Sequence, residues 1–239
     1  MRRYDLLPRL GIEPSIGQRV AAALAAAMRE AERTSPGAVT VLDAGCGRKS
    51  PLVQFRPRIA RLVGVDIHVP DPPLAWLDAF ATVDLCAADA TIAEAPFDIV
   101  LSNFTLEHFV RPDVALASFH RWLQPGGSLV ITTVNRRHPF VDGYLRLPDA
   151  LRRRLQPVLK ASAADAHPLV GACNDPVAVR DALARAGFTD VRLETVPNLA
   201  RAWGRHWWTF ALGLAGDLIA QASPSRRSTI LASATRPAA

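Results

Sequence analysis

The fold is decided by the nine residues Val39 to Gly47, which read VTVLDAGCG. Val39–Asp43 is a short run rich in β-formers, and it enters a loop that contains Gly45 and Gly47. Because glycine lacks a Cβ, the chain can turn sharply there and its backbone can approach a ligand closely. This order of residues predicts a buried strand that ends in a ligand-binding loop.

Further strands and helices alternate along the chain on both sides of this stretch. The patterns predict helices at 14–33, 112–123 and 175–186, and further strands at 61–66, 83–87, 97–102, 128–134, 188–196 and 228–235. Such alternation indicates βαβ units, with helices on both faces of a mainly parallel sheet. We therefore expect a Rossmann-like α/β fold of seven strands, with the last strand antiparallel.

Two stretches, at about 135–174 and 197–225, do not fit the alternation. We expect them to be helical insertions over the carboxyl ends of the strands, where open α/β sheets bind ligands. The sequence shows no internal repeat and no clear linker. It is therefore interpreted as a single domain over residues 1–239, with an N-terminal helix at 14–33 and a ligand-binding core at 39–135.

The composition excludes several classes of protein. Of the 239 residues, 49% are hydrophobic and 21% are charged, which is ordinary for a folded, soluble chain. The three cysteines lie far apart without a CxxC pair, which argues against a disulfide framework or a common zinc site and suits a reducing compartment. The apolar run from His206 to Gly216 is interrupted by Asp217, well short of the roughly 18 residues of a membrane span. We expect a cytoplasmic protein.

The positive charge is concentrated in the second part of the chain. Residues 1–135 hold 13 Lys/Arg and 14 Asp/Glu, whereas residues 136–239 hold 15 and 8, a net charge of +7. Since 26 of the 28 cations are arginines, a GC-rich coding sequence explains this basicity. The alternative is that this part meets an anionic partner, such as a phospholipid or an acidic substrate.

Polar residues follow four successive predicted strands, and these are Asp43, Asp66, Asp89 and Asn103. Because the carboxyl ends of parallel strands lie at one edge of a sheet, the four side chains should converge. Asp66 comes 19 residues after Gly47, where an acid can accept hydrogen bonds from a ribose diol. Ser50 replaces the third glycine of a dinucleotide fingerprint, and a carboxylate beside the loop suits a cationic ligand better than a pyrophosphate.

These motifs together resemble the class I S-adenosylmethionine-dependent methyltransferases, in particular the group that modifies small molecules and lipids. The resemblance lies in VLDAGCG, VGVDIH, AADA, and the block FDIVLSNFTLEHF followed by LASFHRWLQPGGSLVITT. It runs from about residue 39 to 135 and resumes weakly at 175–196. It implies S-adenosylmethionine as the cofactor.

The resemblance also implies roles for individual residues. Asp43, Gly45 and Gly47 would cradle the methionine and sulfonium part of the cofactor, and Asp66 would hold the ribose. The adenine would be touched by Ile67, Asp89 and Ala90, and the methionine end would be lined by Asn103 and Phe104. No metal is implied, since Ser102-Asn103 offers no carboxylate pair. Arg48-Lys49 departs from the small residues usual after the first motif.

Two histidines are candidates for the base that removes a proton from a hydroxyl acceptor. His108 follows the fourth predicted strand, and its alternative role is to orient the loop, since LEH is common in this family whatever the substrate. His138 follows the fifth strand on the same rim. Arg136 and Arg137 either bind an acidic group of the acceptor or are solvated rim charges.

Trp203, Trp207 and Trp208 cluster with arginines and precede an almost wholly apolar stretch. This segment is a helix that packs on the sheet, an aromatic wall for a flat or prenylated acceptor, or an interfacial helix at a membrane surface. The run Arg152-Arg153-Arg154 is a solvated helix face or a phosphate-binding site.

The sequence and the resemblance therefore predict methyl transfer to a small organic or lipid-like acceptor, at oxygen and by direct displacement. Two alternatives remain: a membrane-surface enzyme with a lipid-linked substrate, which makes peripheral contact through residues 203–220, and a catalytically inactive cofactor-binding homologue. A nucleic-acid substrate is not expected, because the chain has no RNA-binding module and no NPPY-like motif after FDIVLS.

Overall fold

A computed structural model describes residues 3–159 and 169–238, and it contains one seven-stranded sheet. The strand order is β3-β2-β1-β4-β5-β7-β6. The strands are β1 (Thr40–Ala44), β2 (Arg61–Asp66), β3 (Ala79–Thr82), β4 (Phe97–Asn103), β5 (Leu123–Val134), β6 (Thr189–Val196) and β7 (Thr229–Thr235). The pairs among β1 to β5 are parallel, and β7 is antiparallel to both β5 and β6. The predicted Rossmann-like fold is confirmed.

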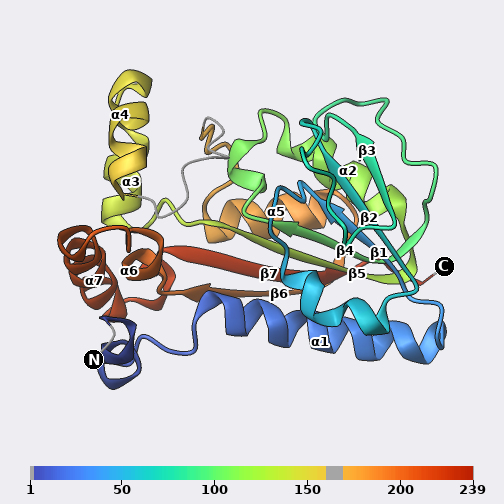
Figure 1. The fold of residues 1–239 in the computed structure, drawn as a ribbon, viewed down its shortest axis with the longest axis horizontal. Helices are drawn as coiled ribbons and strands as arrows, with labels where there is room; N and C mark the ends of the chain where they lie inside the picture. The colour runs from blue at the N-terminus through green and yellow to red at the C-terminus, as the bar shows by residue number, and fades with distance from the viewer. Residues whose placement is uncertain (1–2, 160–168, 239) are drawn as a thin grey trace.

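The helices cover both faces of this sheet and one of its ends (Figure 1). The α-helices are α1 (Ile16–Thr34), α2 (Pro112–Trp122), α3 (Pro139–Leu145), α4 (Asp149–Leu159), α5 (Pro176–Arg185), α6 (Leu199–Ala202) and α7 (Trp207–Gln221). Short 3-10 helices are η1 (Arg3–Leu6), η2 (Pro8–Leu10), η3 (Pro51–Arg58), η4 (Leu106–His108) and η5 (Pro224–Arg226).

Two hydrophobic layers hold the helices to the sheet. On one face, α1 and η3 pack through residues such as Val20, Leu24 and Phe55. On the other face, α2 and α5 pack through Phe119 and Leu183. The apolar positions of α1 recur at helical spacing, so one side of the helix can be buried along its whole length.

The third strand was predicted in the wrong place. The structure places β3 at Ala79–Thr82, whereas residues 83–87 form a turn in which Asp84 accepts a hydrogen bond from the Cys86 N–H at 2.8 Å. β3 is an edge strand that pairs only with β2 and is only partly buried, so its sequence AFAT carries a weak strand pattern. The apolar residues Leu85 and Cys86 are buried, but in a turn.

The fifth strand was predicted at 128–134, but β5 begins earlier and includes the turn-forming residues Gln124–Gly127. The pairing with β4 shifts there, from Phe97 opposite Leu123 to Ile99 opposite Ser128. Extra residues on one strand are accommodated as a bulge, and Gly126 supplies a φ of +81°. The turn residues therefore interrupt the register without ending the strand.

The two insertions gather at one end of the molecule, on the left of Figure 1, where they follow the carboxyl ends of β5 and β6. The first contains α3 and α4, and the second contains α6 and α7. Among the residues described, no helix combines the length and apolar character needed to cross a membrane.

The carboxylate of Asp98, at the start of β4, joins three other elements and is only 4% exposed. It accepts hydrogen bonds from the Thr40 N–H at 2.7 Å and from the Ser35 hydroxyl at 2.9 Å. It also accepts from the amide of Gln124 in the bulge of β5. The carboxylate thus fixes the C-terminal end of α1 and the start of β1 against the centre of the sheet.

Replacing Asp98 with alanine should lower the free energy of unfolding by about 2–4 kcal/mol, since several half-buried donors would lose their acceptor. Urea unfolding monitored by circular dichroism measures this change. Asp181→Ala is the matched control, because Asp181 is exposed on α5, and it should cost less than about 0.5 kcal/mol. Equal losses of unfolding free energy in the two variants would show that the hydrogen bonds of Asp98 do not stabilise the fold.

Candidate functional site

The glycine loop after β1 is held against β2 by its own backbone. The N–H groups of Gly45 and Cys46 both donate to the carbonyl of Val65, at 2.8 and 3.1 Å. Gly45 and Gly47 have φ values of +78° and +49°. A Cβ at residue 45 would lie 2.3 Å from the Thr105 side chain, whereas a Cβ at residue 47 would meet nothing within 4 Å. Gly45 is therefore required by close packing, and Gly47 faces open space.

Asp43 lies at the carboxyl end of β1 and is 2% exposed. Burial raises the pKa of its carboxyl to about 7, a hydrogen bond with Ser50 lowers it, and the nearby Asp66 raises it. Its Oδ2 atom accepts no hydrogen bond from the described residues. Since the folded-state pKa lies above the ordinary 3.8, the ligand-free fold loses stability as the pH rises from there through about 7. A cationic ligand would compensate this charge.

The Asp66 carboxylate lies beside the loop at the end of β2. It accepts hydrogen bonds from the N–H groups of Gly47 and His68, each at 3.1 Å, and the side chain is half-buried. The neighbouring Ile67 is 50% exposed. These contacts fix the carboxylate at the mouth of the loop, where it can still accept hydrogen bonds from a ligand.

Asp89 and Ala90 lie in a loop rather than at the end of a strand, because the third strand ends earlier than predicted. Asp89 is exposed, while Ala90 is buried and its carbonyl accepts a hydrogen bond from Arg121 at 2.9 Å. Their proposed contact with an adenine therefore depends on the position of this loop.

The segment after β4 connects the glycine loop to the substrate side. The Oδ1 atom of Asn103 accepts a hydrogen bond from the Thr132 hydroxyl at 2.8 Å. Phe104 has a φ of +55°, and its N–H donates to Thr132. The next residue, Thr105, packs on Gly45 and donates to the carbonyl of Ala44 at 3.3 Å. Thr132 thus supports a strained turn that positions Asn103 and Phe104.

A small apolar cavity of about 70 Å³ lies between this turn and the insertion helices. It is lined by Phe104, by the end of β5 at Val134, by α3 and by α6. Its other lining residues include Val141, Tyr144, Leu145, Leu199, Ala202 and Trp203. The volume is about half that of a cavity that holds benzene. Only part of an organic molecule fits unless the helices move apart.

The two histidines occupy different environments, and neither lines the cavity. His108 is half-buried at the end of η4, directly after β4 and its turn. His138 has no exposed surface, and its Nδ1 atom accepts a hydrogen bond from the Phe140 N–H at 3.2 Å at the start of α3. Burial lowers the pKa of His138, although a backbone hydrogen bond with Gly216 raises it. His138 therefore packs between α3 and α7, with its Nδ1 atom serving as a hydrogen-bond acceptor.

A buried polar chain behind His108 was not predicted from the sequence. Glu107 is 3% exposed and accepts a hydrogen bond from the Thr133 hydroxyl, which in turn accepts from the Asn174 amide at 2.6 Å. The Glu107 carbonyl accepts from the N–H groups of Val170 and Gly171. This chain fixes η4 to β5 and to the segment that leads into α5. No sequence pattern distinguishes these residues from surface ones.

The tryptophan cluster divides into two parts. Trp203 is 8% exposed, stacks on Phe140 with ring centroids 6.3 Å apart, and lines the cavity. Trp207 and Trp208 are 77% and 46% exposed. Tyr144, which was not singled out from the sequence, also lines the cavity, and burial raises the pKa of its hydroxyl. The apolar spacing of Phe140, Val141, Tyr144 and Leu145 is the signal that could have identified it.

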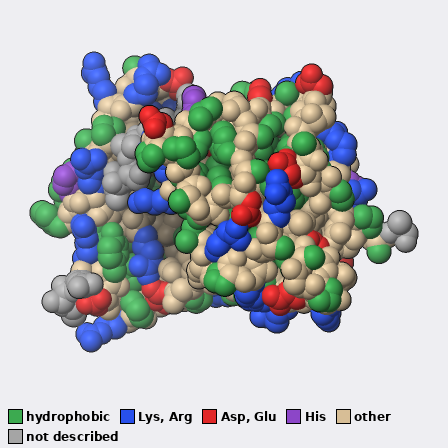
Figure 2. Space-filling view, turned by 45° about the vertical axis from the view of Figure 1, so that its right-hand side comes forward, with side chains coloured by type: hydrophobic (Ala, Val, Ile, Leu, Met, Phe, Trp, Pro, Cys, Tyr) green, Lys and Arg blue, Asp and Glu red, His purple; other side chains and the backbone are tan. Residues whose placement is uncertain are grey.

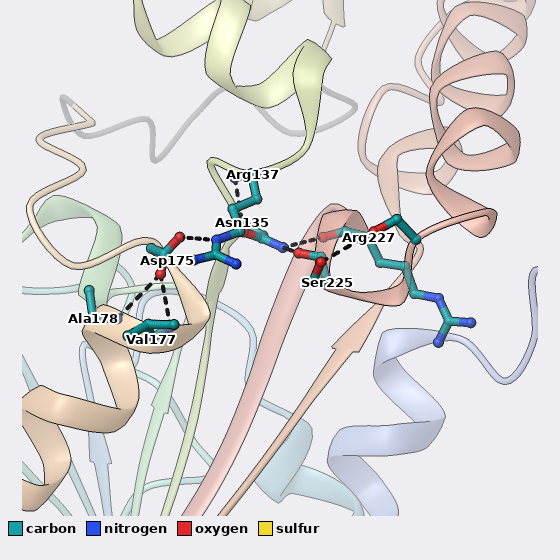
Figure 3. Close-up of polar contacts among 8 residues, drawn as sticks. Asn135, Arg137, Asp175, Val177, Ala178, Ser225 and Arg227 are labelled. Atoms are coloured by element: carbon teal, nitrogen blue, oxygen red, sulfur yellow. Dashed lines mark hydrogen bonds and ion pairs between the residues drawn. The ribbon is translucent and has the colours of Figure 1, made fainter.

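The arginines of the rim are held by carboxylates. Figure 3 shows Arg137 paired with Asp175, which also caps the N-terminus of α5, while the Asn135 amide donates to the carbonyls of Ser225 and Arg227. Arg136 pairs with Asp142 at 3.5 Å. Beside the glycine loop, Arg48 and Lys49 are exposed. Among the described residues, no group of three His, Cys, Asp or Glu side chains could hold a metal.

Comparisons with known proteins agree on one family. A family model described as a methyltransferase domain matches residues 15–193, about three quarters of the chain. The ubiquinone biosynthesis O-methyltransferase of Pseudomonas paraeruginosa is 32% identical over 114 residues, which cover 44% of this chain and 48% of that protein. The match therefore spans about half the length of that relative.

Two further comparisons cover more of the chain. The nocamycin O-methyltransferase of Saccharothrix syringae is 29% identical over 226 residues, covering 84% of this chain and 78% of that protein. The solved structure of an S-adenosylmethionine-dependent methyltransferase from Mesorhizobium loti has a TM-score of 0.55 and 19% identity, and covers 90% of this chain and 96% of that one. This structural likeness shows the shared fold.

Replacing Gly45 with alanine should destabilise the protein by about 2–4 kcal/mol, because a Cβ would collide with Thr105 at a positive φ. Gly47→Ala is the matched control with strain but no collision, and should cost about 1 kcal/mol. Urea unfolding gives both values. In a Thr105→Ala background the cost of Gly45→Ala should fall. The same cost in both backgrounds would show that the collision is not what excludes a side chain at residue 45.

Proposed function

The chain belongs to the class I S-adenosylmethionine-dependent methyltransferases, and from that premise we propose that it methylates an oxygen of a small, largely apolar organic or lipid-like acceptor. The observation that carries this proposal is the position of the apolar cavity. Phe104 lines the cavity, and the adjacent Thr105 packs on the glycine loop. An acceptor in the cavity would thus contact Phe104, whose neighbour in the chain packs on the glycine loop.

The residues around the loop fit the proposed cofactor. S-adenosylmethionine supplies a methyl group activated by a positively charged sulfur, and its direct displacement requires mainly alignment and exclusion of water. The unpaired oxygen of Asp43 suits the cationic methionine end, and the open space at Gly47 admits a ligand close to the backbone. Asp66 would hold the ribose, with Ile67, Asp89 and Ala90 on the adenine side.

The acceptor side would be built from Asn103, Phe104 and the cavity. Apolar walls at Leu145, Leu199 and Trp203 would bind the acceptor body and exclude water. Two relatives that resemble this chain are named as O-methyltransferases, which supports oxygen as the methylated atom.

For the base we propose His108 rather than His138. His108 lies directly after the turn that carries Phe104 and retains exposed surface, so an imidazole nitrogen can take a proton from an acceptor hydroxyl. His138 has no exposed surface and already accepts a backbone hydrogen bond. A catalytically inactive homologue is the alternative. Two cations beside a cationic cofactor would favour that alternative, but Arg48 and Lys49 are exposed beside the loop, and solvent can screen their charges.

Cofactor binding should depend on pH through Asp43. Below its pKa of about 7 the carboxyl is neutral, so affinity for the cation should rise about tenfold between pH 5.5 and 7.0. Calorimetric titration with S-adenosylmethionine measures this rise. In Asp43→Asn the dependence should disappear, whereas Asp66→Ala should weaken binding at both pH values. An unchanged pH dependence in Asp43→Asn would exclude Asp43 as the partner of the cation.

Filling the cavity should block the acceptor without affecting the cofactor. Ala202→Leu places extra volume in the cavity wall, so kcat/KM should fall by about tenfold or more through misplacement of the acceptor, while calorimetric affinity for the cofactor stays the same. Turnover is measured as radiolabelled methyl transfer to a panel of phenols and catechols with apolar substituents.

Ala184→Leu, at an exposed position of α5, is the matched control and should retain turnover. Full activity of Ala202→Leu with every acceptor would place the acceptor site elsewhere. Cofactor binding by wild-type protein without transfer to any acceptor would favour the inactive homologue.

A further inference from the structure

The outward face of α7 is entirely apolar. Its exposed positions in the helix are Trp207, Trp208, Ala211, Leu212, Ala215, Leu218 and Ile219. Because residues three and four apart share a side of a helix, these positions form one continuous stripe. Trp207 and Ile219, near its two ends, are 77% and 61% exposed. An ordinary surface helix would present charged or polar side chains there.

Two polar residues of α7, Thr209 and Asp217, instead face inward. Asp217, its only charged residue, has no exposed surface and accepts hydrogen bonds from the N–H groups of Leu199 and Ala200 at 3.0 and 2.8 Å. A Cβ at Gly213 would lie 2.6 Å from the Leu199 carbonyl oxygen, so α6 and α7 are in close contact. The inner side of α7 therefore packs through Asp217, its glycines and Phe210, and this packing does not involve the large apolar residues on the outer side.

Positive charge surrounds this face. Between residues 198 and 228 the only carboxylate is the buried Asp217, while Arg205 and Arg226 are exposed near the two ends of α7. The N-terminal segment packs on α7 through Leu7, Ile12 and Phe210. It adds the exposed Arg3 and Arg9, against the exposed Asp5 and the half-buried Glu13, which pairs with Arg201. On the left of Figure 2, hydrophobic and basic side chains lie next to one another, with some acidic side chains among them.

We propose that the outward face of α7 docks on the surface of a lipid bilayer that contains anionic phospholipids. Tryptophan and aliphatic side chains would enter the boundary between headgroups and acyl chains, and the arginines at both ends would meet lipid phosphates. α7 lies at one extreme of the molecule, beyond the ends of β6 and β7 (Figure 1), so its stripe can meet a flat surface.

Charge favours a bilayer over a second copy of this chain. A twofold contact through α7 would bring the same basic patch of both copies to one interface, and like charges there oppose association. Anionic headgroups instead complement the patch. The proposal does not depend on the methyl-transfer reaction, although the cavity lies on the inner side of the same helical pair, at Leu199 and Trp203.

The test is co-sedimentation with vesicles of phosphatidylcholine alone or with about one third phosphatidylglycerol. Wild-type protein should bind the anionic vesicles more strongly, and high salt should weaken the binding. The variant Trp207→Ser/Ile219→Ser should bind about tenfold more weakly. Val177→Ser, at a 51% exposed position on α5, is the matched control and should bind like wild type.

A second measurement needs no variant. Brominated acyl chains should quench tryptophan fluorescence of the wild-type protein on anionic vesicles, because Trp207 and Trp208 would enter the boundary region. Equal binding by the double variant, or absence of vesicle binding and quenching, would overturn the proposal. Analytical ultracentrifugation tests the remaining occupant. If the wild-type protein forms a dimer but does not bind vesicles, and the double variant is a monomer, the face binds a second copy and the proposal is wrong.

Discussion

The contact between Gly45 and Thr105 is the constraint on which the site depends. β1 and β4 are adjacent parallel strands, so the loops at their carboxyl ends meet, and there is no room for a side chain at residue 45. This contact places the turn at Phe104 beside the glycine loop. The cavity on the other side of Phe104 is therefore held at a fixed distance from the loop by packing within the central sheet.

Electrostatics at the loop make the ligand-free protein less stable than its packing alone would allow. Asp43 is buried with one oxygen unpaired among the described residues, and Asp66 lies close enough to raise its pKa further. Burying such a carboxylate has a free-energy cost that a cationic ligand can remove. The site thus lowers the stability of the ligand-free fold and favours binding of a cation. Asp98, at the opposite end of the strands, differs because several donors form hydrogen bonds to its carboxylate.

The second insertion, which contains α6 and α7, has an inner side that packs on the protein and an outer side that is exposed. The inner side of α6 and α7 carries Asp217, close glycine contacts and part of the cavity wall, while the outer side carries the exposed apolar stripe. Hydropathy alone does not show which side of α7 faces the protein, because apolar residues lie on both of its sides and Asp217 is its single charged residue. The hydrogen bonds of Asp217 and the exposure of the residues opposite it show which side faces the protein.

Local sequence patterns were enough to predict the Rossmann-like fold, the glycine loop, and Asp43 and Asp66 at the ends of β1 and β2, since strand patterns, glycines and caps act locally. Thus Asp175 caps α5 as its position before Pro176 predicts. Tertiary structure decided what depends on distant neighbours. β3 forms at Ala79–Thr82 because pairing with β2 outweighs its weak pattern. His108 and His138 both follow predicted strands, so the sequence does not distinguish them as bases. In the fold, the packing of α3 against α7 buries His138 and leaves His108 partly exposed. Local chemistry fixes which elements form, whereas burial is set by contacts between residues far apart in the chain.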